Sequence, residues 1–258
     1  MSSRTRLTFP ITLSTTPSPN NTLQIHITDP RSTTANNLAL ATWGSSEVLA
    51  NLLHLLPIPD FSGSGPGTNT FPILELGAGT GLVGLSAAAI WQSWACLTDL
   101  PPILPNLEAN IALNRDTLTQ HGGSAACGVL DWSDPATPIL ESSTPPTTPS
   151  PSRARVILAA DTVYSEDHPA LLTQAVMARL EKAEPARLVL CYPLRIGYLD
   201  HIRELWRLLE EEAGLVCVRE GRERLDESWE EETPYEWLET RQADGDNIGN
   251  TYQGSAAQ

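Results

Sequence analysis

The sequence has no apolar run that approaches the roughly 18 residues needed to cross a membrane. Residues 1–6 (MSSRTR) lead into a polar, Thr- and Pro-rich stretch, which lacks the hydrophobic core of a secretory signal. The four cysteines lie far apart without a C-x-x-C pair, which indicates reduced core residues and a cytoplasmic protein. The five histidines show no metal-ligand spacing, so we expect no metal site.

Basic residues are also scarce. The chain has 16 Lys and Arg against 31 Asp and Glu, a formal net charge of −15. Much of the excess falls between Glu204 and Asp246. So acidic a chain is poorly suited to nucleic acid, which needs cations against phosphate. It would attract a lysine-rich protein surface, although a solvated helix face followed by an acidic tail explains the pattern equally well.

The 258 residues, 41% of them hydrophobic, suffice for one buried α/β core. We expect a single domain over residues 1–241, with an N-terminal β-hairpin extension at 1–37. Within it, the Pro/Ser/Thr-rich segment 134–152 is expected to be a disordered insertion. The polar segment 242–258 is expected to form a flexible tail.

Short β-prone runs alternate with amphipathic runs, a pattern typical of a doubly wound, mostly parallel sheet with helices on both faces. In such sheets ligands bind at the carboxyl ends of the strands. The expected strands are residues 71–76, 95–99, 126–132, 155–164 and 187–192, and antiparallel strands at 215–219 and 235–240 close the sheet. The expected helices begin near residues 45, 82, 101, 167 and 198, and Ser45 or Ser46 is expected to cap the first of them.

The most informative stretch is residues 71–85 (FPILELGAGTGLVGL), which predicts a strand, a tight glycine turn and a helix. A helix amino terminus over such a turn suits an anionic cofactor group. Residues 79–84 match the dinucleotide pattern G-x-G-x-x-G, whereas residues 75–81 resemble motif I of class I S-adenosylmethionine (SAM) methyltransferases. The register favours SAM, because the strand runs into Gly77, and Glu75 suits an ammonium group. A nucleotide site and a purely structural turn remain as alternatives.

Acidic and aromatic residues follow the other strands. Asp99 can accept both hydroxyls of a ribose, or it can cap the next helix. Asp131 and Trp132 could recognise an adenine ring through a carboxylate and a flat aromatic face. Asp161 and Tyr164 stand at the end of the fourth strand, where Tyr164 could alternatively be a packing residue. The convergence of several motifs on one sheet edge is stronger evidence than any one of them.

Together these motifs resemble the seven-β-strand protein-lysine methyltransferases of the methyltransferase-16 group, which modify translation elongation factors and chaperones and include fungal members. The likeness covers roughly residues 38–215. It rests on residues 41–43 (ATW), 75–82 (ELGAGTGL), 98–99 (TD), 106–110 (NLEAN), 131–132 (DW) and 160–164 (ADTVY). The Pro/Ser/Thr-rich insertion and the acidic C-terminal half depart from the family pattern.

The resemblance implies a class I SAM-dependent methyltransferase fold with SAM as cofactor. The implied SAM contacts are Trp43, Gly77, Ala78, Gly79, Asp99, Trp132 and Ala160, to which the residues themselves add Glu75 and Asp131. Asp161 and Tyr164 match the family's Asp-x-x-Tyr motif beside the methyl-transfer channel. The expected function is methylation of a lysine on a protein, such as elongation factor 1-alpha, by a monomer. A small-molecule methyltransferase and a non-catalytic SAM-binding scaffold are the alternatives.

Overall fold

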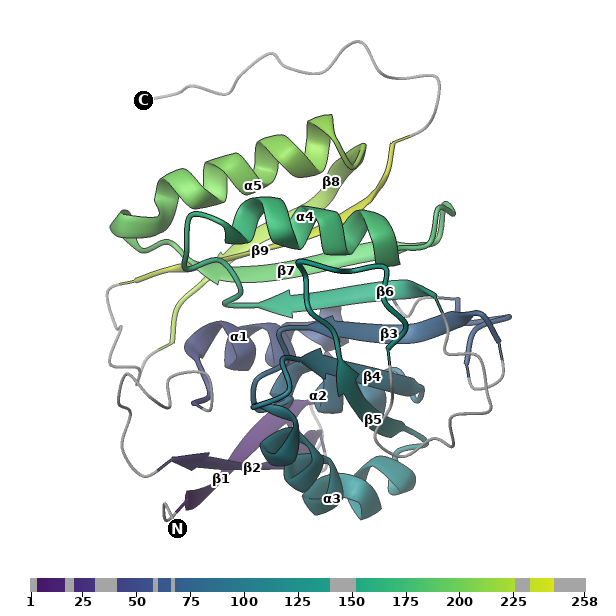
Figure 1. Cartoon of the computed structure of the whole chain (residues 1–258). Coiled ribbons are helices and arrows are strands. Elements are labelled where there is room, and N and C mark those ends of the chain that lie inside the picture. Colours follow the sequence, from purple (N-terminus) through teal and green to yellow (C-terminus); the bar gives the residue numbers. More distant parts are fainter. Residues whose placement is uncertain are drawn as a thin grey trace.

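The structure is a computed structural model that describes residues 4–16, 21–30, 41–57, 60–65, 68–139, 152–225 and 233–243 (Figure 1). Most of the expected insertion and tail, residues 140–151 and 244–258, lies outside these ranges, so those two predictions are not tested. Within the described ranges, no helix combines the length and the apolar character that a membrane span requires.

A seven-stranded sheet forms the centre of the fold, in the order β5-β4-β3-β6-β7-β9-β8. The first five strands pair in parallel, and β9 runs antiparallel between β7 and β8. The predicted doubly wound sheet is therefore confirmed. The strands are β3 (Thr70–Leu76), β4 (Trp94–Asp99), β5 (Ser124–Val129), β6 (Arg153–Ala160), β7 (Arg187–Pro193), β8 (Leu215–Glu223) and β9 (Tyr235–Gln242).

Helices cover both faces of this sheet, because the central strands bury both of their sides (Figure 1). Side chains alternate along β3, with Ile73 in one hydrophobic cluster and Leu74 in the other. The first cluster includes residues of α1 (Gly44–Leu52), η2 (Leu53–Leu55), α2 (Leu82–Ile90) and α3 (Leu104–Gln120). The second includes residues of α4 (His168–Arg179) and α5 (Leu199–Glu211), with η3 (Ile196–Tyr198) just before α5.

The predicted N-terminal hairpin is present as β1 (Arg4–Thr12) and β2 (Thr22–Pro30). It docks on α3 through three buried asparagines spaced four residues apart, Asn106, Asn110 and Asn114, which share one helix face. The Asn114 side chain exchanges two hydrogen bonds with the backbone of His26, at 2.7 and 2.8 Å. Oδ1 of Asn110 accepts from the N–H and the hydroxyl of Thr28. We call these three residues the asparagine ladder.

Several element boundaries differ from the predicted ones. The first helix begins at Gly44 without a side-chain cap, so the expected capping by Ser45 or Ser46 is wrong. The third strand ends at Val129 and the fourth at Ala160, which leaves their acidic and aromatic residues on the following loops. Such loops can turn side chains toward a ligand, which a strand with strict alternation cannot do freely.

Candidate functional site

A glycine turn joins β3 to α2 at the carboxyl edge of the sheet. Gly77, Gly79 and Gly81 have φ angles of 64°, 54° and 83°, a left-handed region that favours glycine. The N–H of Ala78 donates to the carbonyl of Thr98 at 2.9 Å, which ties the turn to β4. Because α2 begins at Leu82, directly after this turn, its unpaired N–H groups face the same edge.

Gly77 also lacks space for a side chain. A Cβ placed there would lie 3.1 Å from Trp132 Cζ2 and 3.1 Å from Thr162 Cγ2. These two atoms belong to the loops after β5 and β6. The glycine therefore keeps open the space between the carboxyl ends of β3, β5 and β6.

A cavity of about 700 Å³ opens over this turn. Of the eleven residues proposed from the sequence, ten line it: Trp43, Gly77, Ala78, Gly79, Asp99, Asp131, Trp132, Ala160, Asp161 and Tyr164. They come from five separate segments of the chain, so the fold brings together residues that are far apart in the sequence. The lining also includes residues that sequence reasoning missed, among them Ser46, Thr80, His168, Arg195 and Tyr198.

Glu75 is the proposed residue that is not part of this lining. Its side chain is buried, and Oε2 accepts a hydrogen bond of 3.0 Å from the N–H of Gly84 in the first turn of α2. Burial raises its pKa to about 8, with a smaller opposing effect of the Gly84 bond. The carboxyl group thus joins β3 to α2 behind the turn, and the geometry does not support a contact with an ammonium group.

The Asp99 carboxylate reaches the cavity from the end of β4. Its Oδ2 accepts from the N–H of Gly79 at 2.8 Å, and its Oδ1 accepts from the N–H of Leu100 at 2.7 Å. Burial raises the pKa of Asp99, and the two backbone bonds oppose the shift. Each carboxylate oxygen can accept more than one bond, so the group is fixed in place while still able to receive ligand hydroxyls.

Asp131 and Trp132 form another wall of the cavity. The exposed carboxylate of Asp131 accepts from the hydroxyl of Ser133 and from its N–H, at 2.7 and 2.8 Å. Both bonds lower the pKa of Asp131, and the bond from the hydroxyl has the larger effect. Trp132 lies edge-on to the His168 ring, with centroids 6.0 Å apart. An ionised carboxylate next to a flat ring is an arrangement that can hold a heteroaromatic base.

Asp161 has an unusual conformation for a residue other than glycine, with φ at 55°. Its N–H donates to the carbonyl of Cys191 in β7 at 2.9 Å. Arg195, just beyond β7, donates two hydrogen bonds to its carboxylate, at 3.0 and 3.2 Å. The Asp161 side chain is only 4% exposed, and this bidentate ion pair fixes its orientation.

Arg195 further connects this pair to the start of α1, since its guanidinium lies 5.6 Å from the centre of the Trp43 ring. The sequence contained one signal for this residue, its position two residues after the end of β7. The same strand-end rule that pointed to Asp99 and Asp161 therefore applies to Arg195.

Tyr164 lies on the open side of the cavity and is 55% exposed. Its ring lies edge-on to the His168 ring, with the ring centroids 4.3 Å apart. Nδ1 of His168 lies 2.9 Å from the carbonyl oxygen of Thr162, to which it can donate a hydrogen bond. Burial is the main cause of a raised pKa at Tyr164, and the charges of Asp99 and Asp161 add to it. Tyr164 therefore keeps its hydroxyl proton at neutral pH and can donate a hydrogen bond into the cavity.

The family comparison agrees with this geometry. A family model described as lysine methyltransferase matches residues 19–204. Protein-lysine N-methyltransferase EFM2 of Saccharomyces cerevisiae is 33% identical over 77% of this chain and 47% of its own length. Protein-lysine N-methyltransferase rrg1 of Schizosaccharomyces pombe is 37% identical over 66% of this chain and 51% of its own. The chain thus spans about half the length of these two relatives.

Solved structures resemble the fold at low sequence identity. A candidate RNA methyltransferase from Pyrococcus horikoshii matches with a TM-score of 0.50 and 10% identity, over 83% of this chain and 91% of its own. An O-methyltransferase family 2 protein from Planctomyces limnophilus matches with a TM-score of 0.50 and 15% identity, over 83% of this chain and 63% of its own. The chain has the fold of class I SAM-dependent methyltransferases and belongs to the lysine methyltransferase family.

Proposed function

We propose that this chain transfers a methyl group from SAM to the side-chain nitrogen of a lysine on a protein. The observation that carries the proposal is the single cavity that joins the glycine turn to an Asp161–Arg195 pair and to Tyr164. Membership of the lysine methyltransferase family supports the choice of acceptor. We also propose that residues 1–241 work as one domain, that the chain acts as a monomer, and that it acts in the cytoplasm.

The lining is chemically suited to SAM. The α2 amino terminus and the turn of Gly77, Ala78 and Gly79 would hold the carboxylate of the methionine part. Asp99 would accept from the ribose hydroxyls, and Asp131 with Trp132 would hold the adenine. A volume of about 700 Å³ is in the usual range for sites of such ligands.

Ala160 and Trp43 complete the proposed site around the reacting end of the cofactor. When bound, SAM supplies an electrophilic methyl group on a positively charged sulfur. The transfer would form a bond from the lysine nitrogen to the methyl carbon as the carbon–sulfur bond breaks, and the bonding pair would stay on sulfur. The protein therefore contributes mainly position and exclusion of water.

The lysine must first lose a proton, because an ammonium group has no lone pair. With a reference pKa near 10.4, this costs roughly 4–5 kcal/mol at pH 7. We propose that Asp161 and Tyr164 orient the amine and that the proton leaves to water. The pair with Arg195 stabilises the ionised form of Asp161, which makes this carboxylate a better hydrogen-bond acceptor than proton carrier.

The substrate protein is proposed to be a translation elongation factor, such as elongation factor 1-alpha. The resemblance described above supports this choice, and so does the net charge of −15, which favours a basic partner. The lysine-bearing surface of the substrate would approach the open side of the cavity, where Tyr164 is exposed.

Tritiated SAM tests this function. The purified chain is incubated with protein extract from cells that lack it, and label is followed into protein, RNA and small molecules. We expect label on a protein band and a methylated lysine in its mass spectrum. The Asp161→Ala variant should bind SAM in calorimetry yet transfer no label. Label confined to small molecules, or SAM binding without any transfer, would contradict protein-lysine methylation.

A further inference from the structure

Three exposed apolar side chains lie on segments that line the cavity. Ile196 is 89% exposed, Tyr164 55% and Leu100 48%. Leu100 and Tyr164 line the cavity itself, and Ile196 follows the lining residue Arg195 in the chain. We call these three residues the mouth surface. Single exposed apolar residues are common, but three on the segments of one cavity can form a surface that a partner covers.

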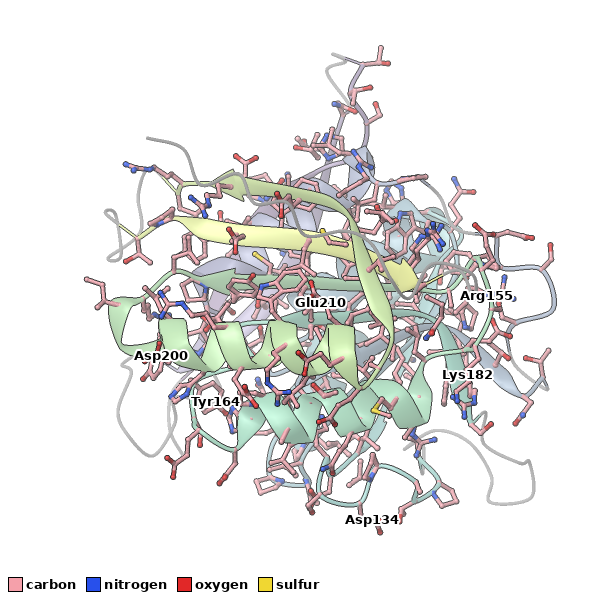
Figure 2. All side chains as sticks on the ribbon, turned by 90° about the horizontal axis from the view of Figure 1, so that it is seen from above. Asp134, Arg155, Tyr164, Lys182, Asp200 and Glu210 are labelled. Atoms are coloured by element: carbon pink, nitrogen blue, oxygen red, sulfur yellow. The ribbon has the colours of Figure 1, made fainter. Side chains whose placement is uncertain are left out.

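Exposed carboxylates lie on or next to the segments that carry the mouth surface. Asp131 lines the cavity, Glu166 and Asp167 follow Tyr164 in the chain, and all three are exposed. Asp200 is 91% exposed at the start of α5 (Figure 2). Two cations of this region form ion pairs, Arg195 with Asp161 and Arg203 with Asp200, so the charge of Asp200 is balanced by its own partner. We call the other three exposed carboxylates, Asp131, Glu166 and Asp167, the acidic border.

The chain itself offers almost no lysine to this opening. Lys182 is the single lysine in the sequence. It lies beyond the carboxyl end of α4, whereas Tyr164 lies before its amino end, and Figure 2 shows the two near opposite ends of this helix. A lysine that enters the cavity must therefore come from another molecule.

We propose that the mouth surface docks a basic segment of the substrate protein in which an apolar side chain lies near the target lysine. This inference rests on the proposed function and adds a recognition element to it. The apolar side chain would cover Ile196, while the acidic border would receive the segment's cationic residues. Aliphatic contact and charge complementarity together favour a basic protein segment over a small metabolite, which would need an enclosing lid.

The Ile196→Ser variant tests the surface. Initial rates of tritium transfer from SAM are measured over a dilution series of protein extract from cells that lack this chain. We expect an about tenfold lower rate in dilute extract, the size that corresponds to one buried aliphatic side chain, and recovery toward the parent rate in concentrated extract. SAM affinity in calorimetry should be unchanged, and Ile196→Leu should restore the rate.

Leu113→Ser provides the matched control, because Leu113 is an exposed aliphatic residue of α3 that does not line the cavity. It should behave like the parent protein. An unchanged rate for Ile196→Ser, or an equal loss for Leu113→Ser, would overturn the docking surface while leaving methylation intact. No label transfer by the parent protein would overturn the proposed function, and the docking surface with it. A Lys182→Arg background makes certain that all lysine-borne label belongs to the extract.

Discussion

Arg195 is the residue that most changes the interpretation of the site. It holds both oxygens of Asp161 and lies over Trp43, so it acts through these two side chains as a positioning residue. Sequence inspection could place Asp161 at a strand end, but the identity of its partner depends on where β7 ends relative to β6. That information exists only after the sheet is assembled.

Replacement of Arg195 by Gln should lower kcat about 100-fold, because the buried carboxylate loses its charge-assisted partner. Breaking a fully buried pair costs roughly 3–5 kcal/mol, and the cost here should be smaller because Arg195 is one-fifth exposed. Rates of label transfer with varied extract separate kcat from KM. Arg195→Lys should recover part of kcat, whereas a role in folding alone would lower Tm in both variants and leave kcat of the folded protein unchanged.

Glu75 shows how strand alternation, rather than residue type, sets the direction of a side chain. Its acidic side chain suggested an ammonium partner, yet the alternation of β3 directs it toward α2 rather than over the turn. A Cβ on Gly84 would come within 2.5 Å of its Oε2, which explains a glycine inside that helix. In the G-x-G-x-x-G pattern of residues 79–84, the first two glycines therefore serve the turn, and the last one allows α2 to pack against β3.

The pH dependence of stability should report on Glu75. Its folded pKa of about 8 exceeds the usual 4.5, so the folded state binds the additional proton between these values. The stability from this group is complete below about pH 4.5 and declines as pH rises through 8. Between pH 5 and 8 the Tm of the parent protein should therefore fall further than the Tm of Glu75→Gln, by a difference of at least about 2–4 °C. Equal slopes for both proteins in scanning calorimetry would argue against a protonated Glu75.

At the level of elements, the asparagine ladder connects the hairpin to the cofactor turn. Besides holding Thr28, Asn110 donates from Nδ2 to the carbonyl of Thr80 at 2.9 Å. Asn114 holds the same hairpin but does not contact the turn through any hydrogen bond among the described residues. The hairpin was predictable from alternation and turn residues. Its docking site was not, because polar residues spaced four apart produce no periodic pattern of hydrophobic residues in the sequence.

Asn110→Ala and Asn114→Ala should separate these two roles. Both variants leave buried backbone groups unpaired and should lose about 1–3 kcal/mol of stability. Only Asn110→Ala should also weaken SAM binding, by about tenfold, since the carbonyl of Thr80 loses its partner beside the cavity. Calorimetric titration of both variants with SAM measures this difference. Equal SAM affinities would show that the ladder stabilises the hairpin without affecting the turn.

At the level of the whole molecule, the sequence predicted the sheet, its antiparallel closing strands and the common edge of the site. Strand-end residues such as Asp99 and Trp132 could be found because parallel strands all deliver their ends to one side. The start of α1 without a cap from Ser45 and the end of β6 before Asp161 could not be predicted. At both places tertiary packing overrides the local preferences of the residues.

The strongly negative charge gives a prediction for the whole molecule. If the acidic surface attracts a basic substrate, added salt should screen this attraction beyond about 8–10 Å. Raising NaCl from about 50 to 300 mM should slow label transfer to dilute extract severalfold and leave SAM affinity almost unchanged. Transfer rates that do not respond to salt would indicate that the acidic residues form only a solvated face.

The central claim is that SAM occupies the cavity over the glycine turn, and calorimetric titration of the intact chain tests it most directly. We predict one-to-one binding of SAM, no binding of NAD, and loss of SAM binding in Gly77→Val. The added side chain would require a left-handed conformation and would meet Trp132 and Thr162. A melting curve confirms that the variant is folded. Undiminished SAM binding by folded Gly77→Val, or binding of NAD in place of SAM by the parent protein, would contradict the account.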